Sequence, residues 1–537
     1  MKADLRTIFY FEGMKKLLLL LFLWALISTS CEKAHENKSS PRPNILFAIA
    51  DDQSFGHAGA YGCSWIKTPA FDRVAKEGLL FNKAYTPNAK CAPSRSCILT
   101  GRNSWQLEEA MNHWPLFPEK FKTVAESLAD HGYWVGKTGK GYAPGIALRN
   151  GEKRELLVQD YSEKKLTPPA KHISNNDYAA NFEAFLHDKK EDQPFFFWYG
   201  STEPHRRYEF GVGLEKGGKK LDEVQSIPDF WPNSDTVRTD MLDYAYEIEY
   251  FDSHLGKMLD LLEAKGELEN TLIVVTSDNG MPFPRIKGQI YEYDNHLPLA
   301  IMWAKGLKDA GRQIDDYVNF IDFAPTFLEL AGIKQGDSGM EEIRGRSLMS
   351  FFEGETHDRY RENYVILGKE RHDVGRPDDQ GYPVRAIVQG RYALSMNFEP
   401  DRWPAGDPIT GYLNCDGSPT KTQILNERRR EGKSTYWDLN FGKRPELELY
   451  DLETDPWCIN NLAGNPEQFN RKADMLKLLL DELAKDGDPR VLGNFAMIDS
   501  YKYMDKNTAD FYNRFMAGEE MKVGWVNPGD FESSNLE

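Results

Sequence analysis

The sequence contains little cysteine for its length. Only six of the 537 residues are cysteine, at positions 31, 63, 91, 97, 415 and 458. So few thiols at such wide spacing exclude a small disulfide scaffold. They also lack the paired Cys-x-x-Cys spacing of a structural zinc site. The chain must therefore be stabilised mainly by its core, and no disulfide pairing follows from the sequence.

An excess of positive charge is also missing. The chain has 66 Lys and Arg against 83 Asp and Glu, a formal net charge of −17 at pH 7. This balance argues against nucleic acid and acidic membranes as general partners. A polyanionic substrate would need a local basic pocket. The hydrophobic fraction of 40% and aromatic fraction of 12% are those of a globular protein with room for one large core and a smaller one.

Long hydrophobic runs are absent too. The run at residues 17–27 follows Lys15 and Lys16, suits a signal peptide and is short for a membrane span. Small residues at 28–30 precede Cys31, which resembles a bacterial lipoprotein cleavage site. We therefore predict a signal peptide at 1–31, a polar linker at 32–43, and an exported protein that is periplasmic or membrane-anchored through a lipid on Cys31. Cleavage and secretion without a lipid is the alternative.

Two apolar runs that end in acidic or amide side chains predict a metal site. Residues 44–50 and 272–276 read as strands buried on both faces, and residues 242–262 have the periodicity of a crossover helix between them. The first strand leads into Asp51 and Asp52, the second into Asp278 and Asn279. Ligands bind at the carboxyl ends of such strands, and these four oxygen donors suit a hard cation such as calcium. Helix capping by the first two acids is the alternative.

The stretch at residues 91–102, CAPSRSCILTGR, predicts a reactive position at a helix start. Pro93 suits the first position of a helix, which places Cys91 just ahead of the unsatisfied amide donors. An anionic or polarised group is favoured there. The alternative is a buried structural cysteine.

This stretch resembles the signature of the type I sulfatases, Cys-x-Pro-Ser-Arg followed by Leu-Thr-Gly-Arg, which is complete here. The resemblance implies that a maturation enzyme oxidises Cys91 to formylglycine, whose hydrate is the nucleophile. It also implies that calcium is bound by Asp51, Asp52, Asp278 and Asn279 together with residue 91, and that Arg95 helps to neutralise the sulfate oxygens.

A second block, residues 131–142, is similar to the family's Gly-Tyr-x-Thr-x-x-x-Gly-Lys-Trp-His pattern. The resemblance implies that Lys140 contacts both sulfate and nucleophile. The family's histidine, which helps to regenerate the aldehyde, falls on Tyr142. Tyr142, another side chain such as His113, or water must then take that role.

Further matches complete the implied site. Residues 195–199 read as a third buried strand, followed by Glu203-Pro204-His205, which resembles the family's acid-Pro-His element. The resemblance implies that His205 protonates the leaving group, which suits its pKa range. Lys287 is the best match to the second sulfate-binding cation. The alternative for His205 is a structural role, which is common for a lone histidine after a strand.

Within this family the chain looks closest to the heparan N-sulfatases. That resemblance rests on residues 276–284, 203–206, 371–374 and 382–385. It implies hydrolysis of the N-sulfate of glucosamine in heparin or heparan sulfate, with O-sulfate as the alternative position. The residues expected to contact the sugar are Glu203, Arg206, His372, Asp373 and Arg385, although a salt bridge between domains is an equal alternative for the last three.

The expected fold is α/β: a large, mostly parallel sheet flanked by helices, which the resemblance makes alkaline-phosphatase-like, and a smaller C-terminal α+β domain. We predict a catalytic domain at 44–380 and a C-terminal subdomain at 381–537. The latter would contain two short strands at 385–394, a strand at 446–452 and an amphipathic helix at 473–483. Two other functions stay open: phosphodiester or phosphonate hydrolysis on the same scaffold, and glycan binding without catalysis if Cys91 is never oxidised.

Overall fold

A computed structural model describes residues 42–354, 363–534 and 536. The predicted signal peptide and nearly all of the predicted linker lie outside the described residues. Residues 43–537 form one compact unit. In the part of the chain that is described, no helix combines the length and apolar content needed to cross a membrane.

The centre of the unit is a large sheet with the strand order β10-β2-β9-β8-β1-β7-β4, and β11 also pairs with β2. All neighbouring strands run parallel except β9, which is antiparallel to β2 and β8. The strands predicted at 44–50, 195–199 and 272–276 are confirmed. The bounds are β1 Asn44–Ala50, β2 Leu79–Tyr85, β4 Trp134–Gly139, β7 Phe195–Gly200, β8 Thr271–Ser277, β9 His296–Met302, β10 Arg312–Ile314 and β11 Val318–Asn319.

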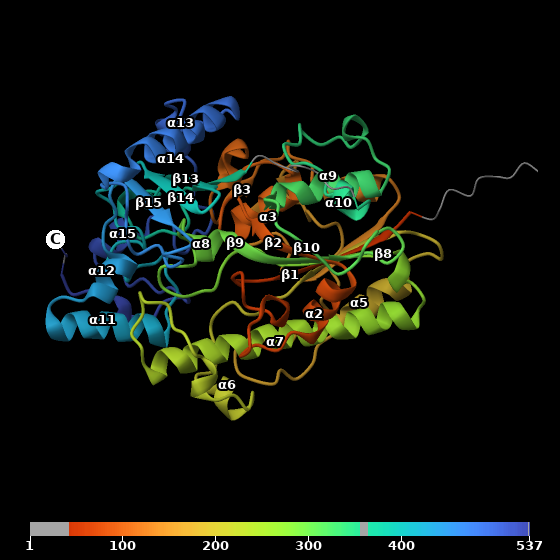
Figure 1. The fold of residues 1–537 in the computed structure, drawn as a ribbon, viewed down its shortest axis with the longest axis horizontal. Helices are drawn as coiled ribbons and strands as arrows, with labels where there is room; N and C mark the ends of the chain where they lie inside the picture. The colour runs from red at the N-terminus through yellow and green to blue at the C-terminus, as the bar shows by residue number, and fades with distance from the viewer. Residues whose placement is uncertain (1–41, 355–362, 535, 537) are drawn as a thin grey trace, which may run out of the picture. The chain divides into compact units, whose positions relative to one another are not determined.

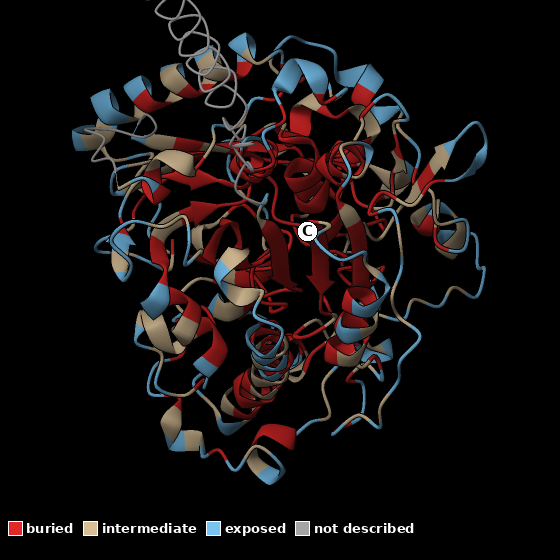
Figure 2. Cartoon of the chain, turned by 90° about the vertical axis from the view of Figure 1, so that its right-hand side faces the viewer, coloured by how far each residue is buried: buried red, intermediate tan, exposed pale blue. Residues whose placement is uncertain are grey.

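Both faces of this sheet are covered by helices, as Figure 1 shows. Side chains alternate along β1, so Ile45, Phe47 and Ile49 enter one core cluster and Leu46 and Ala48 enter another. The first cluster includes α3 Cys91–Thr100, α4 Val124–Asp130, α9 Phe323–Leu330 and α10 Met349–Phe352. The second includes α2 Pro69–Glu77, α5 Tyr178–Asp188 and α7 Asp235–Ala264. Strands β1, β7, β8 and β9 are accordingly buried throughout, while most exposed residues lie on the outer helices and loops (Figure 2).

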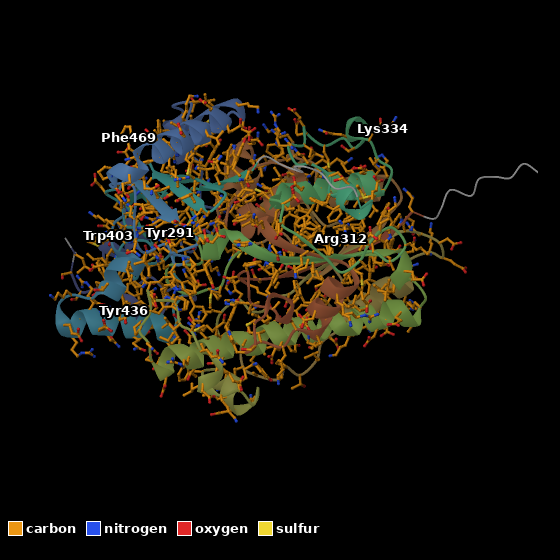
Figure 3. The ribbon with its side chains drawn as sticks, viewed as in Figure 1. Tyr291, Arg312, Lys334, Trp403, Tyr436 and Phe469 are labelled. Atoms are coloured by element: carbon orange, nitrogen blue, oxygen red, sulfur yellow. The ribbon has the colours of Figure 1, made fainter. Side chains whose placement is uncertain are left out.

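The C-terminal part contains a four-stranded antiparallel sheet in the order β12-β13-β14-β15. Its strands are β12 Tyr364–Lys369, β13 Val384–Gln389, β14 Tyr392–Asn397 and β15 Leu447–Asp451. Helix α13, Phe469–Lys485, packs on this sheet through Met475, Leu479 and Leu483. Its first residue, Phe469, is 64% exposed and lies at the periphery (Figure 3). The predicted strands and helix of this region are confirmed. The boundary at 380 stays a prediction, and β12 lies on its N-terminal side.

Shorter elements complete the chain. The segment at 211–238 contains α6 Val212–Glu215 and the start of α7. The other elements are a small sheet of β3 Leu116–Phe117, β5 Ile146–Arg149 and β6 Glu152–Lys153, and the helices α8 Glu292–Asn295, α11 Pro419–Glu431, α12 Thr435–Phe441, α14 Phe495–Asp499 and α15 Phe511–Met516.

Candidate active site

The candidate site lies where four neighbouring parallel strands end. Strands β4, β7, β1 and β8 are adjacent and parallel, so their carboxyl ends meet at one edge of the sheet. Asp51 follows β1, Asp278 follows β8, and Lys140 follows β4. Residues more than two hundred positions apart in the chain are thereby brought into contact.

Four acidic or thiol groups form the centre of the site. One ligand atom from each of Asp51, Asp52, Cys91 and Asp278 lies within 4.8 Å of the others, and all four residues are buried. Asn279 donates from Nδ2 to Asp52 Oδ1 at 2.7 Å, while its Oδ1 is buried without a protein partner. A buried oxygen without a donor is costly unless a cation or water satisfies it. The oxygen-rich donor set therefore fits a hard metal ion.

Three cationic side chains neutralise these carboxylates. Lys140 Nζ lies 2.5 Å from Asp51 Oδ2, and Lys287 Nζ lies 2.7 Å from Asp52 Oδ2. Arg95 Nε donates to Asp278 Oδ2 at 2.8 Å. Burial raises the pKa of Asp51, but Lys140, His205 and Arg95 together outweigh this effect and leave that pKa below its ordinary value. The buried charges are tolerated because each has a partner of opposite sign.

Arg95 also shapes the loop that follows β4. Its guanidinium is fully buried and donates from NH1 to the carbonyl oxygens of Lys140, at 2.7 Å, and Gly141, at 2.8 Å. One side chain thus fixes both Asp278 and the backbone that presents Lys140. The fork of donors on a guanidinium suits this bridging position.

Cys91 is the first residue of α3, with Lys90 as the N-cap. The helix was expected to begin at Pro93, but it begins two residues earlier, and Pro93 occupies the first turn, where its missing N–H breaks no helix bond. The Cys91 Sγ lies 3.4 Å from Asp51 Oδ1. Burial and the neighbouring Asp51 carboxylate raise the pKa of the Cys91 thiol well above its ordinary value. In this setting the side chain is a protonated thiol at the positive end of a helix.

His205 lies at the edge of this cluster. Its Nδ1 lies 2.6 Å from the carbonyl oxygen of Arg206, so this nitrogen carries a proton in either state of the ring. The Nε2 atom faces the acids, 4.0 Å from Asp52 Oδ2, and the side chain is 31% exposed. The ring therefore offers Nε2 to a bound molecule.

Asp416 is a member of the site that the sequence did not suggest. Its Oδ2 lies 2.9 Å from Lys287 Nζ, and it groups with Asp52 and His205 within 4.8 Å. Burial raises its pKa, but Lys287, Lys90 and His205 together reverse the effect and lower the pKa below its ordinary value. The residue lies in an irregular segment before α11, where neither periodicity nor a family motif indicates a function.

Tyr142 directly follows Gly141 in the loop after β4. It is half-buried, and its ring packs edge-on against Phe117 at the margin of the core, with centroids 5.1 Å apart. Its role in place of the histidine stays a prediction, beside His113 and water. His113 is buried, with Nδ1 3.0 Å from Asp373 Oδ1 and Nε2 without a protein partner. Burial lowers the pKa of His113 to about 4, so its ring is neutral at pH 7.

The residues predicted to contact the sugar are mostly engaged by protein groups. Glu203 accepts hydrogen bonds from Tyr178 and Ser201 and is 1% exposed. Arg206 pairs with Asp240 at 2.7 Å. These two predicted contacts do not agree with the structure, because the groups concerned are already bonded and buried.

The predicted cluster around the β12–β13 connection is also internal. Arg385 pairs with Glu370 and Asp488 and is 1% exposed, so the salt-bridge alternative holds for it. Both ring nitrogens of His372 lie near oxygens, Gly288 O and Asn88 Oδ1, and the residue is fully buried. Asp373 bonds Lys90 and His113. A direct sugar contact is not available to Arg385 or His372 in this arrangement, and Asp373 supports the residue before Cys91.

The chain is similar in sequence and in fold to several known proteins. A solved structure, BT4656 in complex with its substrate D-glucosamine-2-N,6-O-disulfate, has a TM-score of 0.56 and 21% identity, and the match covers 83% of this chain and 98% of that one. An ulvan-active sulfatase of Formosa agariphila is 26% identical over 520 residues, covering 87% of this chain and 79% of that protein. Human N-sulphoglucosamine sulphohydrolase is 28% identical over 484 residues, covering 83% and 90%.

The family model described as Sulfatase matches residues 43–333. This range contains the cluster of Asp51, Asp52, Cys91 and Asp278, together with both lysines and His205. It ends before Asp416. The large sheet with its helices and the separate antiparallel sheet agree with the solved neighbours. The match covers more than half of the chain and all of the strand ends that build the site, and the chain therefore belongs to the sulfatase family, as a hydrolase of sulfate esters or sulfamates.

Proposed function

We propose that this protein removes sulfate from a sulfated glycosaminoglycan sugar, with the N-sulfate of glucosamine as the position cleaved. The observation that carries the reaction class is the cluster in which Cys91, at the start of α3, lies beside Asp51, Lys140 and Lys287. The proposed position is supported by the similarity to human N-sulphoglucosamine sulphohydrolase over 83% of the chain.

Asp51, Asp52, Asp278 and Asn279 would bind a calcium ion, together with residue 91. A bound calcium ion supplies Lewis-acid stabilisation of the sulfate oxygens. The unpartnered, buried Oδ1 of Asn279 supports this assignment, because it has no protein donor. Arg95 holds Asp278 in place through the hydrogen bond from its Nε.

Residue 91 would act as formylglycine, formed from Cys91 by a maturation enzyme. This group supplies a hydrated aldehyde as the nucleophile. The amide donors at the start of α3 stabilise negative charge at that position. The Asp51 carboxylate, 3.4 Å from the Cys91 sulfur, is placed to accept a proton from the group that replaces the thiol.

Lys140 and Lys287 would bind the sulfate oxygens. Both ammoniums already face the acids at the bottom of the site, where they also balance the charge of the metal ligands. Charge-assisted hydrogen bonds of this kind stabilise the charge that develops during transfer of the sulfuryl group.

His205 would donate a proton from Nε2 to the departing nitrogen or oxygen. The hydrogen bond of Nδ1 to a carbonyl leaves Nε2 as the ring nitrogen open to a bound molecule, and partial exposure gives a substrate access to it. For release of the aldehyde, Tyr142, His113 and water are the candidates, and the packing of the Tyr142 ring against Phe117 favours the other two.

Hydrolysis of an O-sulfate is the second candidate, supported by a similarity of the same order to an ulvan-active sulfatase. A panel of heparin disaccharides that differ only in N-, 2-O- or 6-O-sulfate separates the two. We expect loss of N-sulfate. Loss of 6-O-sulfate alone would refute the proposed position and leave the reaction class intact.

Two further measurements test the reaction class. Sulfated and phosphorylated aryl model substrates distinguish sulfate hydrolysis from phosphodiester or phosphonate hydrolysis. Mass spectrometry of the peptide that spans residue 91 tests its conversion, which changes the mass by about −18 Da relative to cysteine. An unmodified residue 91 in the protein from its native host would support a glycan-binding role without catalysis.

A further inference from the structure

A cavity of about 620 Å³ is lined by residues that directly follow two members of the candidate active site, His205 and Asp416. Its walls come from the segment after His205, the N-terminal part of α7, helix α11 and the C-terminal tail, and include Arg207, Phe210, Thr422, Asn426 and Asn527. We call it the Arg207 cavity. Its volume lies within the range of about 300–1,000 Å³ that is typical of small-molecule sites.

The Arg207 cavity begins one residue away from the reacting groups on two separate segments. Arg206 lines it and directly follows His205, and Gly417 lines it and directly follows Asp416. His205 and Asp416 meet Asp52 within 4.8 Å in the candidate active site. Consecutive Cα atoms are about 3.8 Å apart, so on both segments the wall of the cavity lies within one residue's length of the candidate active site.

The buried wall of the cavity is rigidly built. Arg206 binds Asp240 through two hydrogen bonds of 2.7 and 2.9 Å, and Thr420 Oγ1 donates to the same carboxylate at 2.6 Å. The side chains of Arg206 and Asp240 are 4% and 1% exposed. A second lining acid, Asp243, accepts hydrogen bonds from two backbone amides. These acids are bonded to protein groups and do not present free carboxylates to a ligand.

Arg207 differs from its neighbour. Its guanidinium is exposed and donates from NH2 to the carbonyl oxygen of Gly524 at 2.9 Å. Among residues 42–354 and 363–534, no carboxylate forms an ion pair with it. A guanidinium with free donors is suited to a planar carboxylate or a sulfate.

The remaining lining suits a sugar ring. Phe210 is 56% exposed and offers an aromatic face, while Thr422 and Asn426 add a hydroxyl and an amide. A few convergent polar groups beside an apolar surface are typical of a binding site for a small polar molecule. Helix α11 and Asn527 lie outside residues 43–333, so the cavity is built largely by the part of the chain that the family model does not match.

From these contacts we infer that the Arg207 cavity binds the sugar next to the one that loses its sulfate. That neighbour is an anionic pyranose whose carboxylate or sulfate pairs with Arg207. The inference rests on the proposed function and adds a subsite to it. It assigns to the C-terminal part of the chain a preference for oligosaccharides over monosaccharides.

The test measures binding without turnover. Cys91→Ser protein is titrated calorimetrically with N-sulfoglucosamine and with a disaccharide that joins it to a uronic acid. We expect Arg207→Gln to reduce the preference for the disaccharide, the ratio of the two dissociation constants, by about tenfold, as for loss of one charged hydrogen bond. Thr422→Trp, which fills the cavity, should have the same effect. Arg73→Gln, a surface arginine on α2, is the matched control and should leave the ratio unchanged.

The arms of the experiment separate the possible outcomes. A carboxyl-reduced disaccharide and a 2-O-sulfated one identify which anionic group Arg207 recognises. An unchanged ratio in both cavity variants, with intact binding of the monosaccharide, overturns the subsite and leaves the proposed function standing. Absence of binding to every sulfated sugar refutes the proposed function, and the subsite with it.

Discussion

Replacing Asp416 by Asn tests whether a residue outside the family match belongs to the active site. The substitution keeps the size of the side chain and removes its charge. Lys287 would lose the carboxylate 2.9 Å from its Nζ and keep the one at 2.7 Å on Asp52. Because Asp52 is also a proposed metal ligand, the ammonium would then be drawn toward a single partner and away from the sulfate oxygens.

The expected magnitude follows from the burial of this pair. The Lys287 side chain is 3% exposed and that of Asp416 is 7% exposed, so solvent screens the interaction weakly. Removing one partner of a buried ion pair costs about 3–5 kcal/mol. Since Lys287 keeps its second partner, we expect a smaller loss than this, about 2–3 kcal/mol in transition-state stabilisation. This corresponds to a fall in kcat/KM of roughly 30- to 150-fold.

The assay is steady-state hydrolysis of an aryl sulfate, with urea unfolding measured in parallel. Asp401→Asn, an exposed acid in the same C-terminal region, is the control and should leave both quantities unchanged. A kcat/KM within twofold of the unsubstituted protein would refute the reasoning. Equal losses of activity and folded fraction would show that Asp416 acts only on stability.

Four further outcomes follow from the structure. Cys91→Ala should reduce turnover at least a thousandfold and leave the unfolding midpoint within experimental error, and retained activity would contradict the proposed nucleophile. Tyr142→Phe should keep kcat within about twofold in the aryl sulfate assay, because the ring packs against Phe117, and a larger fall would assign release of the aldehyde to the Tyr142 hydroxyl. Chelation should abolish activity, and added calcium should restore it and raise the melting temperature, whereas indifference to calcium would remove the metal assignment. Burial raises the pKa of Asp252 from 3.8 to about 7, so its contribution to stability is present below pH 4 and is lost as pH rises to 7. Asp252→Asn should therefore gain stability relative to the unsubstituted protein by about 2–3 kcal/mol between pH 5 and pH 7 in urea titrations, and a pH-independent difference would show that the carboxyl has an ordinary pKa.

The strand ends could be predicted from local pattern because both faces of the sheet are covered. A continuous apolar run such as 44–50, with the length of a strand, is best explained as a strand buried on both faces. Acids that follow such strands lie at one edge of the sheet, because the carboxyl ends of parallel strands meet there. For the same reason Asp51, Asp52, Asp278 and Asn279 could be assigned together from sequence positions far apart. The motif around Cys91 identified the chemistry, although the helix begins two residues before the expected position.

The sequence alone determined the family motif, the strands that present the acids and the net charge that restricts partners. The tertiary structure decided which polar side chains remain available to a substrate. Glu203, Arg206 and Arg385 have the residue types of a sugar site, yet each is buried and bonded to a protein partner. Asp416 enters the site from a segment with no recognisable pattern. These assignments depend on pairing between side chains distant in the chain, and a buried charge is held by whichever partner the fold places beside it.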